Sequence, residues 1–527
     1  MNKIIILGLL LLCGAHLSSQ ILPNPTEIKF EDGHFTLKNN AKISFQSIGE
    51  LSADELVFRL KKATGYNFIK TSEISRKGIL FTTKDADESL GEEGYILEIS
   101  PNQIVIRATD EKGMFYGVQS LLQLFPVEVY SKTVRANIKW TVACQKIKDM
   151  PKYTVRSFML DSGRQYQTPD FIKRYLDYMA MLKMNVFHWH LTEGQGWRIE
   201  IKKYPLLTSI GSNVAQGKQQ QGYYTQEDIK DIVAYASKKQ IIVIPEIDVP
   251  GHSEAALTAY PEYTCFGKVP ESVMAFSSHL FCGGNEKTYT FLQDILDEVC
   301  ELFPGQYIHL GGDEAPKKDW NNCPVCQERI KKEGLKNSHE LQLYFSSRLA
   351  NYLKTKNKKV IFWGDVVYHD GVELPDNVIV HWWNSRKHED KALKNAIKRG
   401  HLVIAGTNNY SYLNYPVTPW SQYNIKRTFD IKTMYENNPS DLSYPDSLVL
   451  GMSTSLWTDW YVQEHMIDRR VFPRIFSITE QMWSTGKRKS FEDFYKQVKL
   501  KYGMLRMLGI DYGPGMKDEV TESFSWE

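Results

Sequence analysis

The chain has 527 residues, of which 42% are hydrophobic and 24% charged, and its formal net charge is +2. This length is too great for one small domain and suits a small domain together with a large one. The balance of 64 basic against 62 acidic residues argues against a nucleic-acid-binding surface. The 29 Tyr, 24 Phe and 12 Trp form a high aromatic content of the kind found at carbohydrate sites, where sugar rings stack on aromatic faces.

The first twenty residues have the pattern of a secretory signal peptide. Lys3 gives a basic start, Ile4–Leu12 is a short apolar run, and a cleavage point is expected around Ser18 to Gln20. The run is too short to span a bilayer, and no later segment is apolar enough to do so. Cys13 raises the alternative of a lipid anchor, but Leu12 before it is bulkier than lipid-anchor signals usually tolerate. We therefore expect simple export to the periplasm or the extracellular space.

Residues 21–147 predict a small α/β domain, because strand-like and helical patterns alternate there. This stretch contains no catalytic constellation, so a scaffold or docking role is expected. The predicted strands are Phe35–Phe45, Tyr95–Ile99 and Ile104–Ala108, and the predicted helices are Ser52–Thr64 and Gly113–Phe125.

Residues 148–527 predict a (β/α)8 barrel, because strands alternate with helices eight times. Helix-start signals occur at Thr168, Thr225 and Ser338. A doubly wound sheet is the alternative, but the glycine-rich phosphate loop that would favour it is missing. The predicted strands are Val155–Leu160, Asn185–His190, Ile241–Ile247, Tyr307–Leu310, Val360–Trp363, Val378–Trp382, Leu402–Ala405 and Val449–Leu456.

The fourth predicted strand ends in an unusual way, with two glycines followed by two adjacent carboxylates. Side chains alternate between the faces of a regular strand, so Asp313 and Glu314 cannot share a site unless the pleat is interrupted. Gly311 and Gly312 allow that interruption. Two neighbouring carboxylates do not both ionise easily, so one of them is expected to have a raised pKa and to suit general acid catalysis.

Polar or aromatic residues follow every one of the eight strands, and the C-terminal ends of the strands are where a (β/α)8 barrel carries its chemistry. Each residue alone has an ordinary structural explanation, but eight such strand ends together predict an active site. The residues, in chain order, are Asp161, His188, His190, Glu193, Asp248, His252, Asp313, Glu314, Trp363, Asp365, Trp382, Trp383, Tyr410, Tyr412, Asn414, Trp457 and Asp459.

Six cysteines remain after the leader, and an exported chain permits disulfides. Cys265 and Cys282 flank one loop and are the favoured pair. Cys323 and Cys326 suit either a tight disulfide or half of a zinc site, but no second Cys-x-x-Cys motif completes four ligands. A structural role is expected for them.

The motifs at these strand ends resemble those of glycoside hydrolase family 20, the β-N-acetylhexosaminidases, in both order and spacing. The resemblance covers almost the whole exported length, including the small domain before the barrel. The matching motifs are Arg156–Asp161, His188–Thr192, Pro245–His252, His309–Glu314 and Leu456–Thr458.

The resemblance implies a retaining, exo-acting hydrolase of terminal N-acetylglucosamine or N-acetylgalactosamine that needs no metal or other cofactor. In this family the 2-acetamido oxygen of the substrate replaces the protein nucleophile and forms an oxazolinium intermediate. Glu314 then serves as acid and base, Asp313 orients the acetamido group, and Tyr412 donates to its oxygen. Further residues have implied roles in binding or support, namely Arg156 on ring hydroxyls, Trp363, Trp383 and Trp457 as an aromatic box, and His252, Asn414, Asp459, Glu193, Asp248 and His190.

Three positions depart from the family pattern. Glu193 replaces a usual Asp that holds His252, Asn414 replaces an Asp, and Asp459 replaces a Glu. The last two positions usually bind the 4- and 6-hydroxyls, so the sequence leaves the preference between gluco and galacto sugars open. The natural glycan and the oligomeric state are also open.

Two other classes of function compete with this prediction. A metal-dependent barrel hydrolase would use His188, His190, Asp248, His252 and Asp313 as ligands, but it gives the tryptophans no role. A carbohydrate-binding protein without activity is the other alternative, and the intact Asp313–Glu314 pair argues against it.

Overall fold

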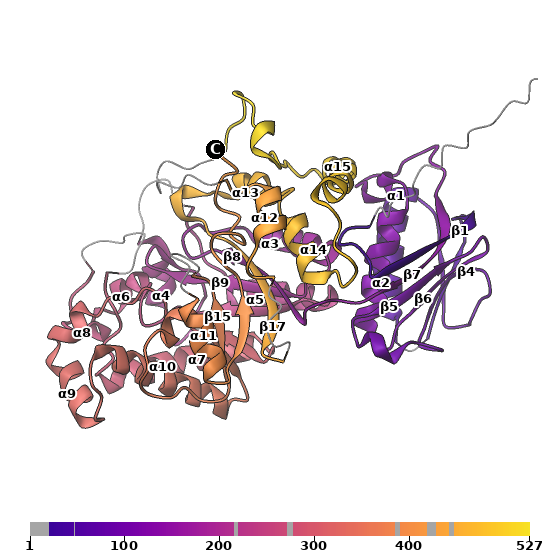
Figure 1. Ribbon diagram of the computed structural model, residues 1–527. Coiled ribbons are helices and arrows are strands. Elements are labelled where there is room, and N and C mark those ends of the chain that lie inside the picture. The colour runs from indigo at the N-terminus through magenta and orange to yellow at the C-terminus, as the bar shows by residue number, and fades with distance from the viewer. Residues whose placement is uncertain are drawn as a thin grey trace, which may run out of the picture.

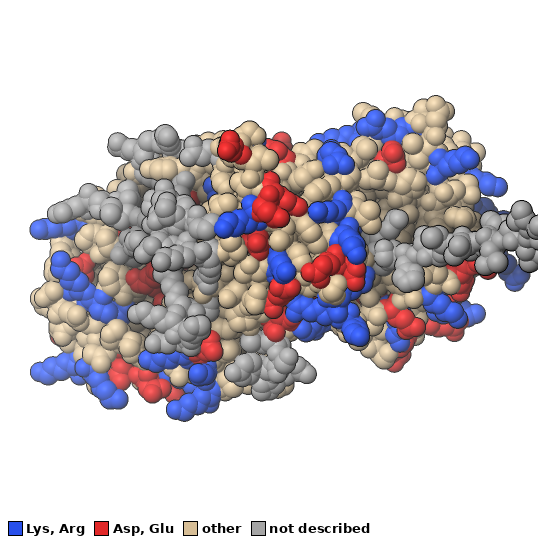
Figure 2. All heavy atoms as spheres, turned by 45° about the horizontal axis from the view of Figure 1, so that its top comes forward, with Lys and Arg blue, Asp and Glu red and all other residues tan. Residues whose placement is uncertain are grey.

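The protein is described from a computed structural model of the whole chain. The described residues are 21–46, 48–214, 220–270, 278–384, 390–418, 428–441 and 447–526. The predicted signal peptide and Cys13 lie outside them. Within the described residues, the longest helices are too polar to cross a membrane. Acidic and basic side chains are interspersed over the face drawn in Figure 2.

The N-terminal part is a seven-stranded mixed sheet with two helices on the side that faces the barrel (Figure 1). The predicted strand Phe35–Phe45 is wrong as one element, because residues 37–41 form a turn between two strands. The elements are β1 (Glu27–Thr36), β2 (Lys42–Phe45), α1 (Glu50–Thr64), β3 (Ile69–Thr71), β4 (Gly78–Thr82), β5 (Tyr95–Ile99), β6 (Gln103–Arg107), α2 (Glu111–Leu124) and β7 (Thr141–Asp149). Their order in the sheet is β1-β7-β5-β6-β4-β2-β3.

The remainder forms a closed barrel of eight parallel strands, which confirms the predicted fold. Every predicted barrel strand is present, with ends that differ by at most one residue. In chain order they are β8 (Val155–Asp161), β9 (Val186–His190), β12 (Ile242–Glu246), β13 (Tyr307–His309), β14 (Lys359–Trp363), β15 (Val378–Trp382), β16 (Leu402–Ala405) and β17 (Val449–Leu456). A short ribbon of β10 (Thr192–Glu193) and β11 (Gly196–Trp197) follows β9.

Helices surround the barrel, and two of the predicted start signals act as caps. The Thr168 hydroxyl accepts from the Phe171 amide, and Thr225 forms a reciprocal capping box with Asp228. The third helix starts at the predicted Ser338, but Asn337 is its cap. The helices are α3 (Pro169–Met181), α4 (Leu206–Ser209), α5 (Gln226–Lys238), α6 (Glu254–Ala259), α7 (Glu286–Leu302), α8 (Lys318–Asn322), α9 (Pro324–Lys332), α10 (Ser338–Thr355), α11 (Lys391–Lys398), α12 (Ile431–Asn437), α13 (Glu464–Val471), α14 (Ile475–Trp483) and α15 (Phe491–Leu508).

The barrel interior is layered along its axis. A buried apolar layer closes the N-terminal end, where the strands begin. Because side chains alternate along a strand, residues two positions further on form the next interior layer. Ile244 of the apolar layer is thus followed by Glu246, and then by Asp248 at the C-terminal end. The apolar layer consists of Val155, Val186, Ile244, Ile361, Ile379 and Ile404.

The small domain is held against the barrel by buried polar contacts. Lys183 Nζ lies 2.7 Å from Asp149 Oδ2, and both side chains are fully buried. The Trp483 indole of α14 donates to the same carboxylate at 3.0 Å. Figure 1 shows α14 and α15, close to the C-terminus of the chain, between the barrel and the small domain.

Candidate active site

A pocket of about 200 Å³ lies at the C-terminal ends of the barrel strands, where the sequence predicted the site. It brings together residues from loops that are far apart in the chain. Its lining residues are Arg164, Glu193, Asp248, His252, Asp313, Glu314, Trp363, Trp383, Tyr412, Asn414, Tyr415, Trp457 and Asp459. A larger hollow of about 630 Å³, lined in part by residues 150–154, lies where β8 begins, at the opposite end of the barrel.

The two glycines after β13 turn the chain so that both carboxylates reach the pocket. Gly311 has φ +61° and Gly312 has φ +96°, values that only glycine adopts without strain. A Cβ on Gly311 would lie 1.7 Å from Asp248 Oδ1. That same oxygen accepts a hydrogen bond from the Gly312 amide at 3.0 Å. The turn therefore depends on the close approach of the Asp248 carboxylate to the backbone.

Asp313 and Glu314 both approach the imidazole of His252. His252 Nε2 lies 3.7 Å from Asp313 Oδ2 and 3.9 Å from Glu314 Oε2. The Asp313 side chain is 13% exposed and that of Glu314 31% exposed. Asp313 Oδ1 is buried and has no hydrogen-bond partner among the described residues. It can thus accept a hydrogen bond from a bound ligand.

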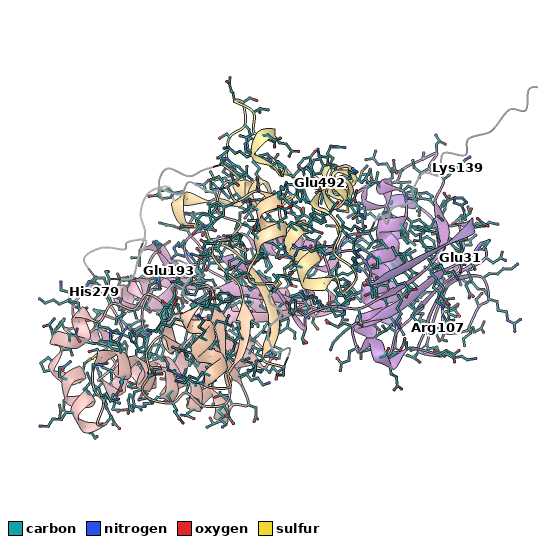
Figure 3. The ribbon with its side chains drawn as sticks, in the orientation of Figure 1. Glu31, Arg107, Lys139, Glu193, His279 and Glu492 are labelled. Atoms are coloured by element: carbon teal, nitrogen blue, oxygen red, sulfur yellow. The ribbon has the colours of Figure 1, made fainter. Side chains whose placement is uncertain are left out.

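A chain of buried charges lies beside this pair. Glu193 Oε1 is 2.7 Å from His252 Nδ1, and Glu193 Oε2 is 2.9 Å from Arg164 Nη2 and 3.3 Å from His190 Nε2. Arg164 and His252 hold the pKa of Glu193 well below its usual range, against its burial. Despite burial, the pKa of His252 is raised well above its usual value by Glu193 and Asp313. The Glu at position 193 thus reaches His252 directly. Figure 3 labels Glu193 within this part of the barrel.

Two carboxyl groups next to this network have raised pKa values. Burial raises the pKa of Asp248 to about 7. Burial and the neighbouring Asp248 raise the pKa of Asp313 well above its usual value. The two groups interact as like charges, so the folded protein favours a proton on the pair near neutral pH. The sequence predicted that repulsion between Asp313 and Glu314 would raise one pKa. A raised pKa is found on Asp313, but burial and Asp248 contribute more to it than Glu314 does.

Aromatic rings form the walls of the pocket. The distance between ring centroids is 5.9 Å for Trp457 and Trp363 and 6.0 Å for Trp457 and Tyr412. The Trp383 indole donates to Asp365 Oδ2 at 2.6 Å, which fixes the orientation of that ring. Burial raises the pKa of Asp365 to about 6. The three predicted tryptophans and Tyr412 thus face one pocket.

The two other predicted polar residues lie together on one side. The Asn414 amide donates to Asp459 Oδ1 at 3.2 Å. The backbone carbonyl of Asn414 accepts from Arg470 Nη1 of α13 at 2.8 Å. These contacts keep one amide and one carboxylate at the pocket edge, where both can bind hydroxyl groups.

The prediction for Arg156 is wrong. Its side chain points out of the barrel toward the small domain, because it lies one position from the inward-facing Val155. The guanidinium is fully buried and pairs with both oxygens of Glu93 at 2.7 and 2.9 Å. The arginine in the pocket is Arg164, which the sequence reasoning missed. The sequence feature that could have identified Arg164 is its position three residues after Asp161, at the end of a strand. In the structure Arg164 Nη1 lies 3.0 Å from Asp161 Oδ2.

A second residue that the sequence reasoning missed is Glu246, which lies beneath the pocket. Its Oε2 is 2.8 Å from His188 Nε2 and 2.7 Å from His190 Nδ1. Its Oε1 accepts from the Trp363 indole at 2.7 Å and lies 3.2 Å from His309 Nδ1. These histidines hold the pKa of Glu246 well below its usual value despite its burial. Glu246 therefore orients both Trp363 and His190 from below.

A parallel barrel whose strand ends carry adjacent carboxylates inside an aromatic pocket defines the class of the protein as a glycoside hydrolase. Residues 153–486 match the pattern "Glycosyl hydrolase family 20, catalytic domain", and residues 18–150 match domain 2 of the same family. The chain belongs to glycosyl hydrolase family 20, as its motifs predicted.

Similar proteins agree with this assignment. The chain is 34% identical over 510 residues to the β-hexosaminidase of Porphyromonas gingivalis, an alignment that covers 93% of this chain and 64% of that protein. The structure of a β-N-acetylhexosaminidase from Bacteroides fragilis is similar with a TM-score of 0.88 and 46% identity, covering 96% of this chain and 99% of that one. A family 20 β-N-acetylhexosaminidase from Streptomyces coelicolor has a TM-score of 0.81 and 27% identity, with 95% and 98% covered.

Proposed function

We propose that the chain is an exo-acting β-N-acetylhexosaminidase that releases terminal N-acetylglucosamine or N-acetylgalactosamine from glycans with retention of configuration. The observation that carries this function is the placement of Asp313 and Glu314 side by side in a small aromatic pocket. Glu193 and Asp313 raise the pKa of their partner His252, and one oxygen of Asp313 is left for a ligand.

The first step breaks the glycosidic bond with the substrate as its own nucleophile. The acetamido carbonyl oxygen attacks the anomeric carbon, and the bond to the leaving oxygen breaks as Glu314 donates its proton to that oxygen. Asp313 accepts the acetamido N–H, and the hydroxyl of Tyr412 donates to the acetamido oxygen. As the oxazolinium forms, a negative charge on Asp313 stabilises the developing positive charge.

The second step opens the oxazolinium. Water attacks the anomeric carbon from the side that the leaving group vacated, and Glu314 takes a proton from it. The bond between the anomeric carbon and the acetamido oxygen breaks, which restores the acetamido group. Two inversions at one carbon give net retention. No protein nucleophile is needed, because the acetamido group is held where an intramolecular attack is fast.

The remaining pocket residues bind the sugar. Trp363, Trp383 and Trp457 enclose the acetamido methyl group and the ring, and Arg164 binds ring hydroxyls through its planar fork. Asn414 and Asp459 are the candidates for the 4- and 6-hydroxyls. An amide can donate to or accept from a hydroxyl of either configuration, so we propose that both gluco and galacto sugars are accepted.

A metal-dependent mechanism is a weaker proposal for this pocket. Asp248, His252 and Asp313 lie close enough together to share an ion, as do His190, Glu246 and Asp248. However, these groups already hold one another, since His252 contacts Glu193 and His190 contacts Glu246 at 2.7 Å. A metal would also leave the aromatic walls without a purpose.

We also propose that the protein is exported, on the basis of the leader pattern of its first twenty residues. Expression of the whole chain in a bacterium followed by fractionation tests this. A mature chain that begins near residue 21 in the periplasm or the medium supports export. A full-length chain in the cytoplasm contradicts it, and a lipid on Cys13 would replace simple export with anchoring.

The experiment that tests the activity is hydrolysis of p-nitrophenyl β-N-acetylglucosaminide by the purified protein, with the matching β-glucoside as control. We expect turnover of the first substrate only, inhibition by a thiazoline analogue of the oxazolinium, and no effect of EDTA. Binding of N-acetylglucosamine without turnover of any hexosaminide would favour a binding protein. Turnover that EDTA abolishes would favour the metal mechanism.

A further inference from the structure

Four cysteines from three separate segments gather at one point beside the active-site loops. The Sγ separations are 3.8 Å for Cys265–Cys326, 3.9 Å for Cys282–Cys323 and 3.6 Å for Cys282–Cys326. All four sulfurs lie within 4.8 Å of one another. The predicted pairing of Cys265 with Cys282 alone is wrong, because Cys323 and Cys326 are equally part of the group.

These separations are those of a tetrahedral thiolate site. Four thiolates about 2.3 Å from a central zinc ion are about 3.8 Å from one another. A disulfide brings its two sulfurs to about 2.05 Å, far shorter than any of the three distances. We propose that Cys265, Cys282, Cys323 and Cys326 form a structural zinc site, a function separate from the hydrolysis proposed above.

The segments that carry the sulfurs are held in place by their own hydrogen bonds. Cys323 occupies the residue before α9 and Cys326 lies in the first turn of that helix, with Pro324 between them at the position that favours a helix start. The Cys282 amide donates to the carbonyl of Tyr263 at 2.8 Å, which ties Cys282 to the segment that carries Cys265. These contacts hold the segments that carry the sulfurs together.

The backbones around the cysteines approach each other closely. A Cβ on Gly284 would lie 2.4 Å from the Val325 carbonyl oxygen and 2.6 Å from the Cys326 amide nitrogen. The Trp320 indole donates to the Phe281 carbonyl at 2.9 Å and covers the same region. Cys282, Cys323 and Cys326 are buried and Cys265 half-buried, so an ion here would be shielded from water. Four protein ligands leave no open position, as expected of a structural site.

The site would join two loops that form the active pocket. Cys265 and Cys282 follow β12, whose loop carries Asp248 and His252, whereas Cys323 and Cys326 follow β13 and the Asp313–Glu314 pair. A second contact joins the same two loops, since His279 Nδ1 lies 3.0 Å from Asp319 Oδ2 of α8. Figure 1 shows α8 and α9 at the end of the barrel far from the small domain, and Figure 3 labels His279 in the same region. The zinc would therefore fix the loop that follows Glu314.

The test measures metal and thiols in the full chain, purified without added reductant after zinc has been supplied during expression. Mass spectrometry of the native protein and elemental analysis should give one zinc per chain. An organomercurial reagent should release that zinc, detected with a chromophoric chelator, as it titrates the four thiols. These readouts do not involve hydrolysis, so they stand or fall independently of the proposed activity.

Variants locate the ion. Cys265→Ser and Cys326→Ser should each lower the bound zinc at least tenfold and lower the melting temperature. Cys300→Ser is the matched control, because Cys300 lies on α7 outside the cluster and should leave the zinc content unchanged. Cys265 is only half-buried, so its variant is the one expected to remain folded if Cys326→Ser does not. The proposal is overturned by a chain that binds no zinc, by two disulfides among the four cysteines, or by zinc that survives in folded Cys265→Ser.

Discussion

At the scale of single residues, the site combines one buried ion pair with two carboxyl groups whose pKa values are raised. Glu193 and His252 form an ion pair at 2.7 Å, which places a positive charge beside Asp313 and Glu314. Asp248 and Asp313 instead have raised pKa values, because they are buried close together. The oxazolinium step needs a negative Asp313, and the imidazolium of His252 is the group that makes this ionisation possible when substrate binds.

Replacing Glu314 by Gln tests its role as the acid. Glu314→Gln should reduce turnover of glycans with poor leaving groups by about 10² to 10⁴-fold, the usual contribution of general acid catalysis. Aryl glycosides with a nitrophenolate leaving group need no proton for bond cleavage, so their first step should slow much less. Values of kcat/KM on the two substrate types check this, because kcat/KM reports the first step without the later opening of the oxazolinium. Equal losses on both would show that Glu314 is not the acid.

The two arginines should separate into a binding role and a stability role. Arg164→Lys should raise KM about tenfold or more, because the loss of one charge-assisted hydrogen bond is worth about 1.5–3 kcal/mol. Arg156→Lys should leave KM unchanged but destabilise the protein by up to about 3–5 kcal/mol, since it weakens a buried ion pair with Glu93. Kinetics and urea unfolding of both variants provide the comparison. If Arg156→Lys raised KM and Arg164→Lys did not, Arg156 would be the arginine that binds the sugar hydroxyls.

Asp248 makes the stability of the protein depend on pH. Its folded pKa of about 7 exceeds its unfolded value of about 3.9, so the folded chain binds the proton more tightly. The tighter proton binding adds at most about 4 kcal/mol to the free energy of unfolding. This stabilisation is fully present below pH 4 and is lost as the pH rises through 7. Relative to Asp248→Asn, the wild type should therefore become less stable between pH 4 and 7, as measured by unfolding at each pH. A constant difference between the two would mean that Asp248 has an ordinary pKa. Asp32→Asn, at an exposed position, is the control.

At the scale of elements, the turn after β13 connects the barrel to its chemistry. The strand was predictable from its apolar run, and the adjacent glycines indicated that the pleat ends there. The reason for Gly311 was not predictable, because it depends on Asp248 from another strand. Arg164 was missed for a similar reason. Its loop gives no periodic signal, and only the fold brings it to Glu193 and Asp161.

Adding a methyl group at Gly311 should disrupt the site. Gly311→Ala places a Cβ against Asp248 and forces φ +61° on an alanine, so both kcat and the melting temperature should fall. Gly334→Ala is the matched control, since Gly334 has φ +66° and no atom within 4 Å of its Cβ position. The control should cost only about 1–2 kcal/mol and leave kcat/KM unchanged. Similar kinetics in the two variants would show that the contact with Asp248 is not required.

At the scale of the whole molecule, the sequence predicted the architecture well and the long-range contacts poorly. The eight strands follow from local apolar patterns, and the order of polar strand ends follows from the barrel. The zinc ligands and the contacts of Arg156 with the small domain join segments that are distant in the chain. Cys265 and Cys326 are 61 residues apart and Arg156 and Glu93 are 63 apart, and local patterns carry no information about such pairs.

The small domain supports the barrel from the side opposite the pocket. Its residue Glu93 holds Arg156 of β8, and its residue Asp149 holds Lys183 before β9. Both contacts are at the N-terminal ends of the strands, whereas the pocket is at the C-terminal ends. The domain therefore contributes to stability at the end of the barrel away from the pocket.

The central claim is that the acetamido group of the substrate is the nucleophile. The most direct test is kcat/KM for aryl β-glycosides whose N-acetyl methyl carries none, one, two or three fluorine atoms. Fluorine withdraws electrons from the acetamido oxygen, so kcat/KM should fall steeply with each added fluorine, while the enzyme and the leaving group stay the same. A rate that does not depend on fluorination would contradict substrate assistance and require a nucleophile from the protein or from water.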